Sequence, residues 1–404
     1  MNKTLRWTAR TVVVTMSAAL FGAIAFGYYT YHRAVDNLVT DDVIVAGDQG
    51  VPMPPGSPTL APRPAEDTTI LLVGVDSRTD AHGHPLSREV LDELRAGNAD
   101  GEQNTDTMMV VHIPADPTKH AFAVSLPRDS YVDIAGGFGT HKLNSAYARA
   151  KNAKLTELLN NGVGQADAEK QATTAGRRNL IATVTALTGL RVDHYAEINL
   201  YGFSEITKAV GGVPVCLNES VHDKYSGAYF PAGKQTLKGV DALKFVRQRH
   251  GLPGGDLDRV RRQQAFLAGL ANRIFSAGTL TDPGKVTSLV DSLTNAVVLD
   301  KNWDLVSFAQ QLQSLTGDRV RFFTIPTIRP DLPTPYDGSA VEVDPAQVRS
   351  FVQELLADHQ SSTGSGRTGK PEPPKKGKSS VVVQRINQTA DEHPIDASEV
   401  PCVN

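Results

Sequence analysis

An uninterrupted apolar stretch at residues 69–75 does most to limit what this chain can fold into. A strand without alternating polar positions has to be covered on both of its faces. Two further apolar runs, 108–113 and 121–126, follow it, and the connection between them contains two prolines and an aspartate, which suits a hairpin. Helical apolar patterns alternate with these runs. We therefore predict an α/β fold, a three-layer α/β/α domain around a central mixed sheet.

The remaining elements of this domain are predicted from their apolar spacing. A further strand is expected at residues 319–325. The expected helices cover residues 177–190, 203–210, 257–275, 303–315 and 345–356. No break rich in Pro, Gly or Ser is long enough to split residues 68–359, so we predict one large core there.

The N-terminus carries an uncharged apolar run at residues 12–31. About 20 helical residues span the ~30 Å hydrocarbon core of a bilayer. Lysine and arginine precede the run and aspartates follow it, which by the positive-inside rule predicts a cytoplasmic segment 1–11 and an extracellular remainder. The expectation is a single-pass signal anchor in the cell membrane. A cleaved signal peptide is the alternative, because residues 23–25 have the small-residue pattern of a cleavage site.

Composition sets the other boundaries. Residues 32–67 are rich in Pro, Gly and Asp and are expected to form an extracellular stalk. Residues 360–404 begin with a basic low-complexity stretch and are expected to form a disordered tail. The formal net charge of −3 argues against a nucleic-acid partner. The two cysteines, Cys216 and Cys402, leave a disulfide and a pair of free thiols both open.

Short clusters of acids and arginines stand at the ends of the predicted strands. They are 74–78, 104–107, 127–129 and 247–263. In a hairpin, Asp106 and the pair Arg128-Asp129 lie at the same sheet edge, and Asp76 joins them if its strand runs parallel to residues 121–126. Carboxylates that hold a hard divalent cation, together with guanidinium groups, are suited to a diphosphate. The clusters therefore predict a phosphorylated substrate.

The last cluster is predicted to combine a strand with a helix. Residues 245–249 alternate with period two, which as a strand would put Phe245, Arg247 and Arg249 on one face. The following helix places Arg259 and Gln263 four residues apart, on one side. Together they would direct several guanidinium groups to one place.

In this order, the motifs resemble the extracellular domain of the LytR-CpsA-Psr family. The matching segments are Gly74–Arg78, Thr105–Met108, Leu126–Asp129, Lys142–Tyr147, Gly211–Val213 and Gly239–Gln263. The resemblance implies an α/β/α domain that binds a polyprenyl diphosphate in an apolar tunnel, with Mg²⁺ or Mn²⁺ at its head group. It further implies a phosphotransferase that moves a glycopolymer from a polyprenyl-diphosphate-linked glycan donor to peptidoglycan, at the cytoplasmic membrane.

The resemblance also implies roles for individual residues. Asp76 and Asp106 are expected to ligate the metal, and Arg128, Asp129 and Arg249 to be catalytic. The expected diphosphate contacts are Arg78, Arg128, Lys142, Arg247, Arg249, Arg259 and Gln263. For Asp129, three roles stay open: completing the metal shell, orienting Arg128 or accepting a proton. Asn104 departs from the family pattern, since many relatives have an arginine there.

Two other functions fit the same residues. One is a lipid diphosphate phosphohydrolase, with water as the acceptor. The other is a non-catalytic module that binds lipid-linked wall precursors. The sequence does not name the glycopolymer or the oligomeric state.

Overall fold

The structure, a computed structural model, describes several separate segments of the chain. These are residues 38–44, 67–94, 96, 105–116, 118–224, 226–248, 251–252, 256–275, 294, 296–301, 303–305, 307–308, 311, 319–361, 395–396 and 400–404. The predicted anchor at residues 12–31 lies outside them. Among the described residues, no helix is long and apolar enough to cross a membrane.

A mixed eight-stranded sheet forms the centre of the molecule, in the order β1-β12-β7-β2-β3-β4-β13-β16. The strands are β1 (Val39–Asp41), β2 (Thr68–Val75), β3 (Thr105–Ile113), β4 (Ala121–Ser125), β7 (His194–Asn199), β12 (Val297–Asp300), β13 (Val320–Thr324) and β16 (Ile395–Asp396). β3 is antiparallel to both β2 and β4, which confirms the predicted hairpin and makes β2 parallel in direction to β4. β2 pairs with β7, and β4 with β13, in parallel.

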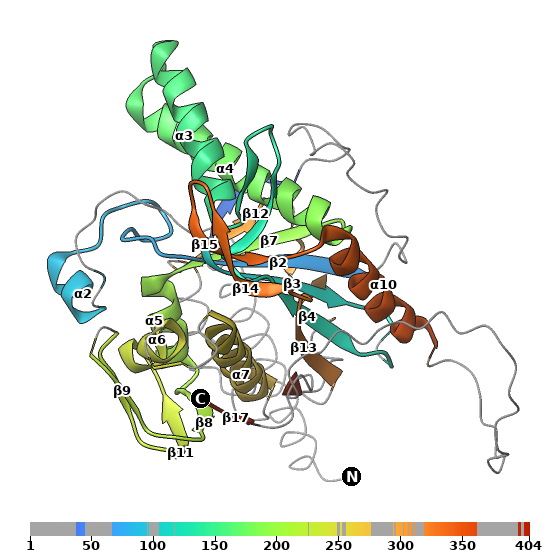
Figure 1. The fold of residues 1–404 in the computed structure, drawn as a ribbon. Helices are drawn as coiled ribbons and strands as arrows, with labels where there is room; N and C mark the ends of the chain where they lie inside the picture. Colours follow the sequence, from blue (N-terminus) through green and yellow to red (C-terminus); the bar gives the residue numbers. More distant parts are fainter. Residues whose placement is uncertain are drawn as a thin grey trace, which may run out of the picture.

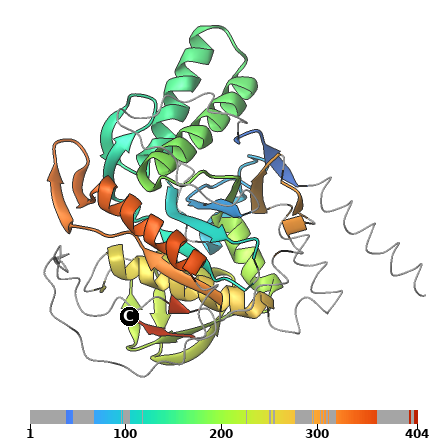
Figure 2. The ribbon, with the colours of Figure 1, turned by 90° about the vertical axis from the view of Figure 1, so that its right-hand side faces the viewer.

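Helices cover both faces of this sheet (Figure 1). α4 (Gln165–Thr188) and α10 (Pro345–Ser361) pack on one face, where Leu71 of β2 shares a cluster with Leu180 and Val348. α7 (Asp256–Phe275) packs on the other, where Ala268 meets Met109. Figure 2 shows the layers from the side. The predicted three-layer α/β/α arrangement with a mixed central sheet is therefore present.

Smaller elements surround these layers. The helices are α2 (Arg88–Glu93), α3 (Ser145–Asn160), α5 (Leu200–Ala209) and α6 (Val240–Arg247). The strands are β5 (Ser130–Ile134), β6 (Gly139–Lys142), β8 (Val213–Leu217), β9 (Val221–Asp223), β10 (Ala228–Phe230), β11 (Gly233–Leu237), β14 (Arg329–Thr334), β15 (Gly338–Glu342) and β17 (Cys402–Val403). They form three small sheets, β14-β15-β5-β6, β11-β8-β17 and β10-β9.

The expected stalk is wrong in its first part, because β1 belongs to the central sheet. Val39–Asp41 pairs in parallel with β12, and Val43 is almost fully buried. Asp41 accepts a hydrogen bond from Arg177 of α4 at 2.7 Å, and the same guanidinium contacts Glu197 of β7. Buried ion pairs of this kind hold an edge strand in one place. The folded domain therefore includes residues well before 68.

The expected disordered tail is wrong at its end. Ile395–Asp396 pairs with β13, and Cys402–Val403 pairs in parallel with β8. Cys402 forms a disulfide with Cys216, which decides the question that the sequence left open. The last residues of the chain are thus covalently tied to the domain.

The predicted strand at residues 245–249 is also wrong, because Val240–Arg247 is the helix α6. Its buried side chains, Ala242, Leu243 and Phe245, follow helical rather than alternating spacing. Gly239, at φ 59°, supplies the left-handed backbone that the turn into the helix requires. Arg249 lies outside the described residues.

Candidate functional site

The site begins at the edge where β2 ends and β3 starts. Gly74 pairs with Thr107 and Val75 with Thr105, so the register shift leaves Asp106 as the extra residue of a β-bulge. Bulges re-aim side chains and are common beside active sites. Asp76 follows Val75 directly. The two aspartates that the sequence singled out therefore lie at one edge of the sheet, on neighbouring strands.

Arg128 connects three strands at this edge. It follows β4 and forms an ion pair with Asp106 through Nη1. Its Nε lies 3.7 Å from Asp129 Oδ2, and the other carboxylate oxygen of Asp129 lies 3.4 Å from Lys142 Nζ, at the end of β6. Asp129 is thus between two cations, an arrangement that orients both. All four side chains are between 15% and 25% exposed, which leaves them accessible from solvent.

A second group gathers around Asp76. Arg78 Nη1 lies 3.5 Å from Asp76 Oδ1, and Arg247 Nη2 lies 3.7 Å from Oδ2. Both arginines also donate to backbone carbonyls that follow α2, Arg78 to Ala96 and Arg247 to Leu94. Arg247 reaches the site from the last turn of a helix, although the sequence placed it on a strand.

Two of the remaining predicted residues lie on α7. Gln263 donates a hydrogen bond to the carbonyl oxygen of Val246, beside Arg247. Arg259, one turn earlier on the same helix, is 5% exposed. The structure thus brings the end of α6 against α7, as the predicted convergence requires.

Arg262, for which the sequence predicts no role of its own, is buried at the centre of this packing. Its Nη1 donates to Gln248, its Nε donates to the backbone oxygen of Asn404, and its guanidinium lies 5.2 Å from the Phe245 ring centre. Burial lowers the pKa of Arg262 to about 10, so it is still a cation at neutral pH. It joins α7 to α6 and to the end of the chain. The contact between Arg262 and Asn404 follows from the pairing of residue 402 with β8, and no pattern in the sequence predicts that pairing.

Asp76 offers an open acceptor for a cation. Its Oδ1 is buried and accepts no hydrogen bond from the residues that the structure describes. Within the same described part of the chain, no three His, Cys, Asp or Glu side chains gather as a metal site. Among the described side chains, Asp76 Oδ1 has only the Arg78 guanidinium nearby, at 3.5 Å. Together with the Asp106 carboxylate it fits a hard cation that takes its other ligands from substrate oxygens and water.

The sheet face beside the site is incompletely covered. Gly74, Leu72 and Asp76 alternate onto the face that α7 covers. Leu72 of β2 and Val111 of β3 lie in the two central strands, yet both are only partly buried, and so is Leu267 of the facing helix. These three side chains therefore keep some contact with solvent, although they lie between the sheet and α7.

Comparisons with known proteins agree with this fold. The profile of the LytR_cpsA_psr family matches residues 46–351. The chain is 44% identical over 358 residues to the cell wall biosynthesis protein LcpA of Corynebacterium glutamicum, which covers 88% of this chain and 67% of that protein. It is 26% identical over 253 residues to the polyisoprenyl-teichoic acid–peptidoglycan teichoic acid transferase TagU of Enterococcus faecalis, covering 62% of this chain and 68% of the relative.

Two solved structures share the fold. One is TagV of B. subtilis, with a TM-score of 0.52 and 22% identity over 75% of this chain and all of that one. The other is the LytR-Csp2A-Psr enzyme of Actinomyces oris, with a TM-score of 0.51 and 17% identity over 79% of this chain and 95% of that one.

Proposed function

Because this chain belongs to the LytR_cpsA_psr family, we propose that it transfers a wall glycopolymer from a polyprenyl-diphosphate carrier to peptidoglycan, as a phosphotransferase. The printed names of two relatives support the proposal, one a cell wall biosynthesis protein and the other a transferase of teichoic acid to peptidoglycan. The donor chemistry is inferred from the residues of this chain.

One observation carries the proposal: two aspartates and several cations from distant parts of the sequence meet at one sheet edge. Asp106 holds Arg128, and Asp76 lies between Arg78 and Arg247. Packing does not require so many partly exposed charges at one place, whereas recognition of a diphosphate does.

In the proposed reaction, an acceptor hydroxyl attacks the sugar-linked phosphorus and releases its proton to solvent water. The new phosphorus–oxygen bond joins glycopolymer and peptidoglycan as a phosphodiester, and the bond to the bridging oxygen breaks, releasing prenyl phosphate. Arg128, Lys142 and Arg247 would stabilise the negative charge on the transferred and departing phosphates. Asp129, between Arg128 and Lys142, would orient both cations.

Asp76 and Asp106 are the residues that would hold Mg²⁺ or Mn²⁺, which when bound supplies positive charge at the diphosphate oxygens. In this proposal Arg78 and Arg247 neutralise Asp76 until the substrate arrives, and Arg249, Arg259 and Gln263 complete the diphosphate site.

The prenyl chain is proposed to lie between the sheet and α7. Support comes from Leu72, Val111 and Leu267, which are only partly buried. A chain in this space would end with its diphosphate at the two aspartates.

We further propose that the domain works outside the cell, anchored by residues 12–31 in the cell membrane. The Cys216–Cys402 disulfide supports this location, since disulfides persist in oxidising compartments.

The test is a transfer assay with a lipid-linked donor and peptidoglycan, in the presence of Mg²⁺. Wild-type protein should attach the glycan to peptidoglycan, and Asp76→Ala protein should stay folded without doing so. Free phosphorylated glycan as the sole product would instead indicate a phosphohydrolase. Donor binding without any turnover would indicate a binding module.

A further inference from the structure

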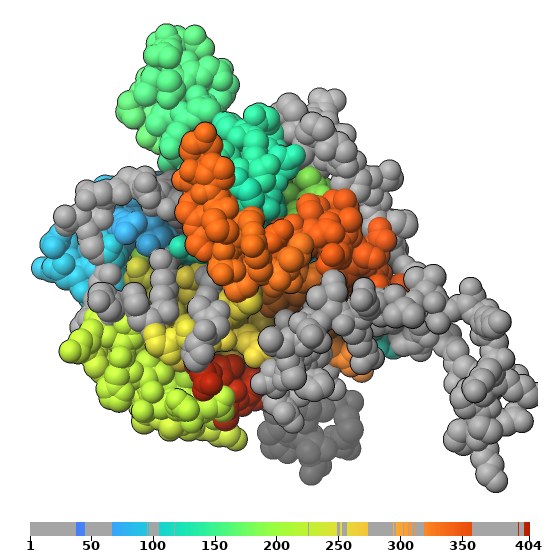
Figure 3. Space-filling view, in the orientation of Figure 1, coloured from blue at the N-terminus to red at the C-terminus, as the bar shows by residue number. Residues whose placement is uncertain are grey.

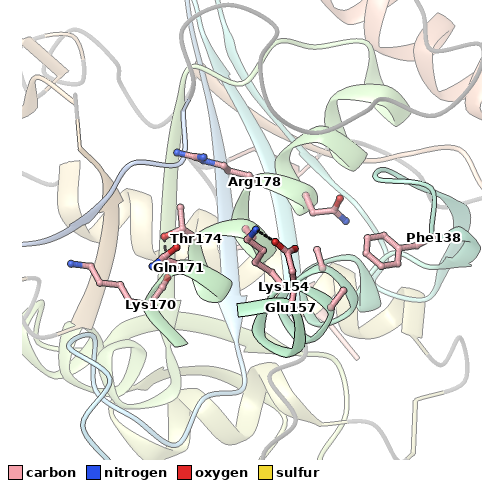
Figure 4. Close-up of a pocket in the computed structure, with 11 residues that line it drawn as sticks. Phe138, Lys154, Glu157, Lys170, Gln171, Thr174 and Arg178 are labelled. Atoms are coloured by element: carbon pink, nitrogen blue, oxygen red, sulfur yellow. Dashed lines mark hydrogen bonds and ion pairs between the residues drawn. The ribbon is translucent and has the colours of Figure 1, made fainter. Parts of the chain in front are cut away.

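A second candidate site lies between α3 and α4, away from the aspartate edge (Figure 4). The groove has a volume of about 660 Å³, within the range of roughly 300–1,000 Å³ typical of small-molecule sites. Neither the sequence motifs nor the proposed transfer chemistry uses it.

The floor of the groove is apolar and the side chains that form it are small. Ala150 and Ala153 of α3 face Ala175 of α4 across it. Phe138, from the turn that precedes β6, lines the groove, and in the view of Figure 4 it lies at the end opposite Lys170. A flat aromatic ring beside a shallow floor of methyl groups suits the apolar face of a sugar ring and the methyl of an acetamido group.

The rim of the groove carries an excess of positive charge. Lys154, Lys170 and Arg178 line it with one acid, Glu157, which pairs with Lys154 at 2.7 Å. Arg178 lies 3.6 Å from Asp42, whose side chain is 65% exposed, so water screens that pair strongly. Lys170 has no ion-pair partner among the residues that the structure describes. Lys170 thus remains for an anionic ligand, whereas Arg178 also donates from Nε and Nη2 to the backbone oxygen of Asp42.

The groove is connected to the aspartate edge by one short strand. β6 runs from next to Phe138 to Lys142, which contacts Asp129. Four strand residues span about 13 Å. α3 and the first part of α4 project from the body of the molecule (Figure 3).

We propose that this groove binds the acceptor, as a segment of N-acetylated glycan whose carboxylates pair with Lys170 and Arg178. The inference rests on the proposed function, since it places the acceptor strand so that a hydroxyl further along it can reach the diphosphate. The amide of Gln171 can hydrogen-bond an acetamido group. The cations favour carboxylated glycan over a neutral one, because a neutral polymer gives Lys170 no anion and leaves Arg178 with only its screened Asp42 pair.

Direct binding tests the groove without any turnover. The probe is soluble, uncrosslinked peptidoglycan strands with their peptide carboxylates, titrated into the full chain by calorimetry. Each of Lys170→Gln and Arg178→Gln should weaken binding by about two- to fivefold, the range for partly exposed ion pairs. Ala153→Leu, which fills the exposed floor without a change in charge, should weaken it as well. N-acetylglucosamine oligomers without carboxylates should bind weakly and equally to wild type and both charge variants.

The matched control is Lys234→Gln, the same charge change at an exposed site on β11, at the opposite end of the molecule (Figure 1). It should bind like wild type. Equal affinity of Lys170→Gln, Arg178→Gln and wild type for the strands would overturn the inference. So would wild-type protein that binds the neutral oligomers as tightly as the carboxylated strands.

Transfer kinetics distinguish the groove assignment from the proposed function. They also distinguish peptidoglycan from the donor's glycopolymer as the polymer in the groove. If the groove holds the acceptor, its variants raise the KM for peptidoglycan and leave kcat and the KM for the lipid-linked donor unchanged. A raised donor KM instead would mean that the groove holds the donor's glycopolymer, and the acceptor assignment is then wrong. Wild type that binds strands in the groove yet transfers nothing would overturn the proposed function alone.

Discussion

Arg247 at the end of α6 lies 3.7 Å from Asp76 at the end of β2, measured from Nη2 to Oδ2. Helix and strand come from distant parts of the sequence, and their ends meet only in the fold. The contact is partly exposed, so a charged substrate can exchange with either partner.

Replacing Asp106 by Asn should reduce transfer by about 10²- to 10³-fold, the size of effect expected when a preorganised charge contact is lost. Asn cannot hold the Arg128 guanidinium as a carboxylate does, and it is a poorer ligand for a cation. Thermal unfolding should change little, since Asp106 is a bulge residue that is 25% exposed. Asp331→Asn, an exposed carboxylate on β14, is the control and should transfer normally.

Removing divalent cations with a chelator should abolish transfer, and Mg²⁺ or Mn²⁺ should restore it. The physical reason is the open Oδ1 of Asp76, which needs a positive partner once a diphosphate draws the arginines away. Mn²⁺ binding, followed by electron paramagnetic resonance, should weaken in Asp76→Asn protein. Full activity in chelator would show that the two aspartates serve another purpose.

Cys402→Ser should lower the free energy of unfolding by about 2–5 kcal/mol, because the disulfide closes a long loop. Cys216→Ser should cost the same amount, and the double variant no more than either. Urea unfolding curves of the three variants measure this. Because Arg262 binds Asn404, these variants should also loosen the end of α6 and raise the KM for the donor.

The free energy of unfolding should fall in acid, because Glu197 becomes protonated there. Burial alone would raise the pKa of Glu197, but the Arg177 guanidinium and the Tyr195 hydroxyl hold it below its usual value. The folded state therefore binds fewer protons than the unfolded state near the unfolded pKa of about 4.3. The stabilisation is complete above that pH and is lost as the pH falls below it. Thermal melts of wild type and Glu197→Gln from pH 7 to pH 3 should converge at the acid end.

Gly269→Ala should displace α7 from β8. An added Cβ would lie 2.4 Å from the carbonyl oxygen of Pro214, a backbone atom that cannot move aside easily. Overpacking of this kind costs about 1–3 kcal/mol. The same shift moves Arg259 and Gln263, so the donor KM should rise together with the loss of stability. Ala265→Gly, on the same helix, tests whether lower stability alone changes the donor KM.

The layers of the fold could be predicted because the spacing of apolar residues along the chain indicates which faces of each element are buried. The run at residues 69–75 is covered on both faces, and the hairpin of residues 108–126 places Arg128 beside Asp106. Strand direction then fixed the edge at which the aspartates lie. These inferences depend on neighbours in sequence, which patterns describe well.

What could not be predicted depends on contacts between distant segments. Five residues that alternate in polarity looked like a strand at 245–249, but the preceding Gly239 and the packing of Phe245 on α7 make residues 245–247 the end of a helix. Likewise, the residues around Val39 and around Cys402 do not predict which strand each segment pairs with, because edge strands take their register from the sheet they join.

If residues 12–31 anchor the chain in the membrane, as proposed, the early position of β1 limits the distance between the domain and the bilayer. With the proposed anchor ending at residue 31, seven residues precede Val39, and seven residues reach at most about 25 Å when fully extended. A connecting segment this short would keep the aspartate edge within a molecular diameter of the lipid headgroups. The enzyme would then sample only carriers embedded in its own membrane, and only the layer of wall that lies directly above it.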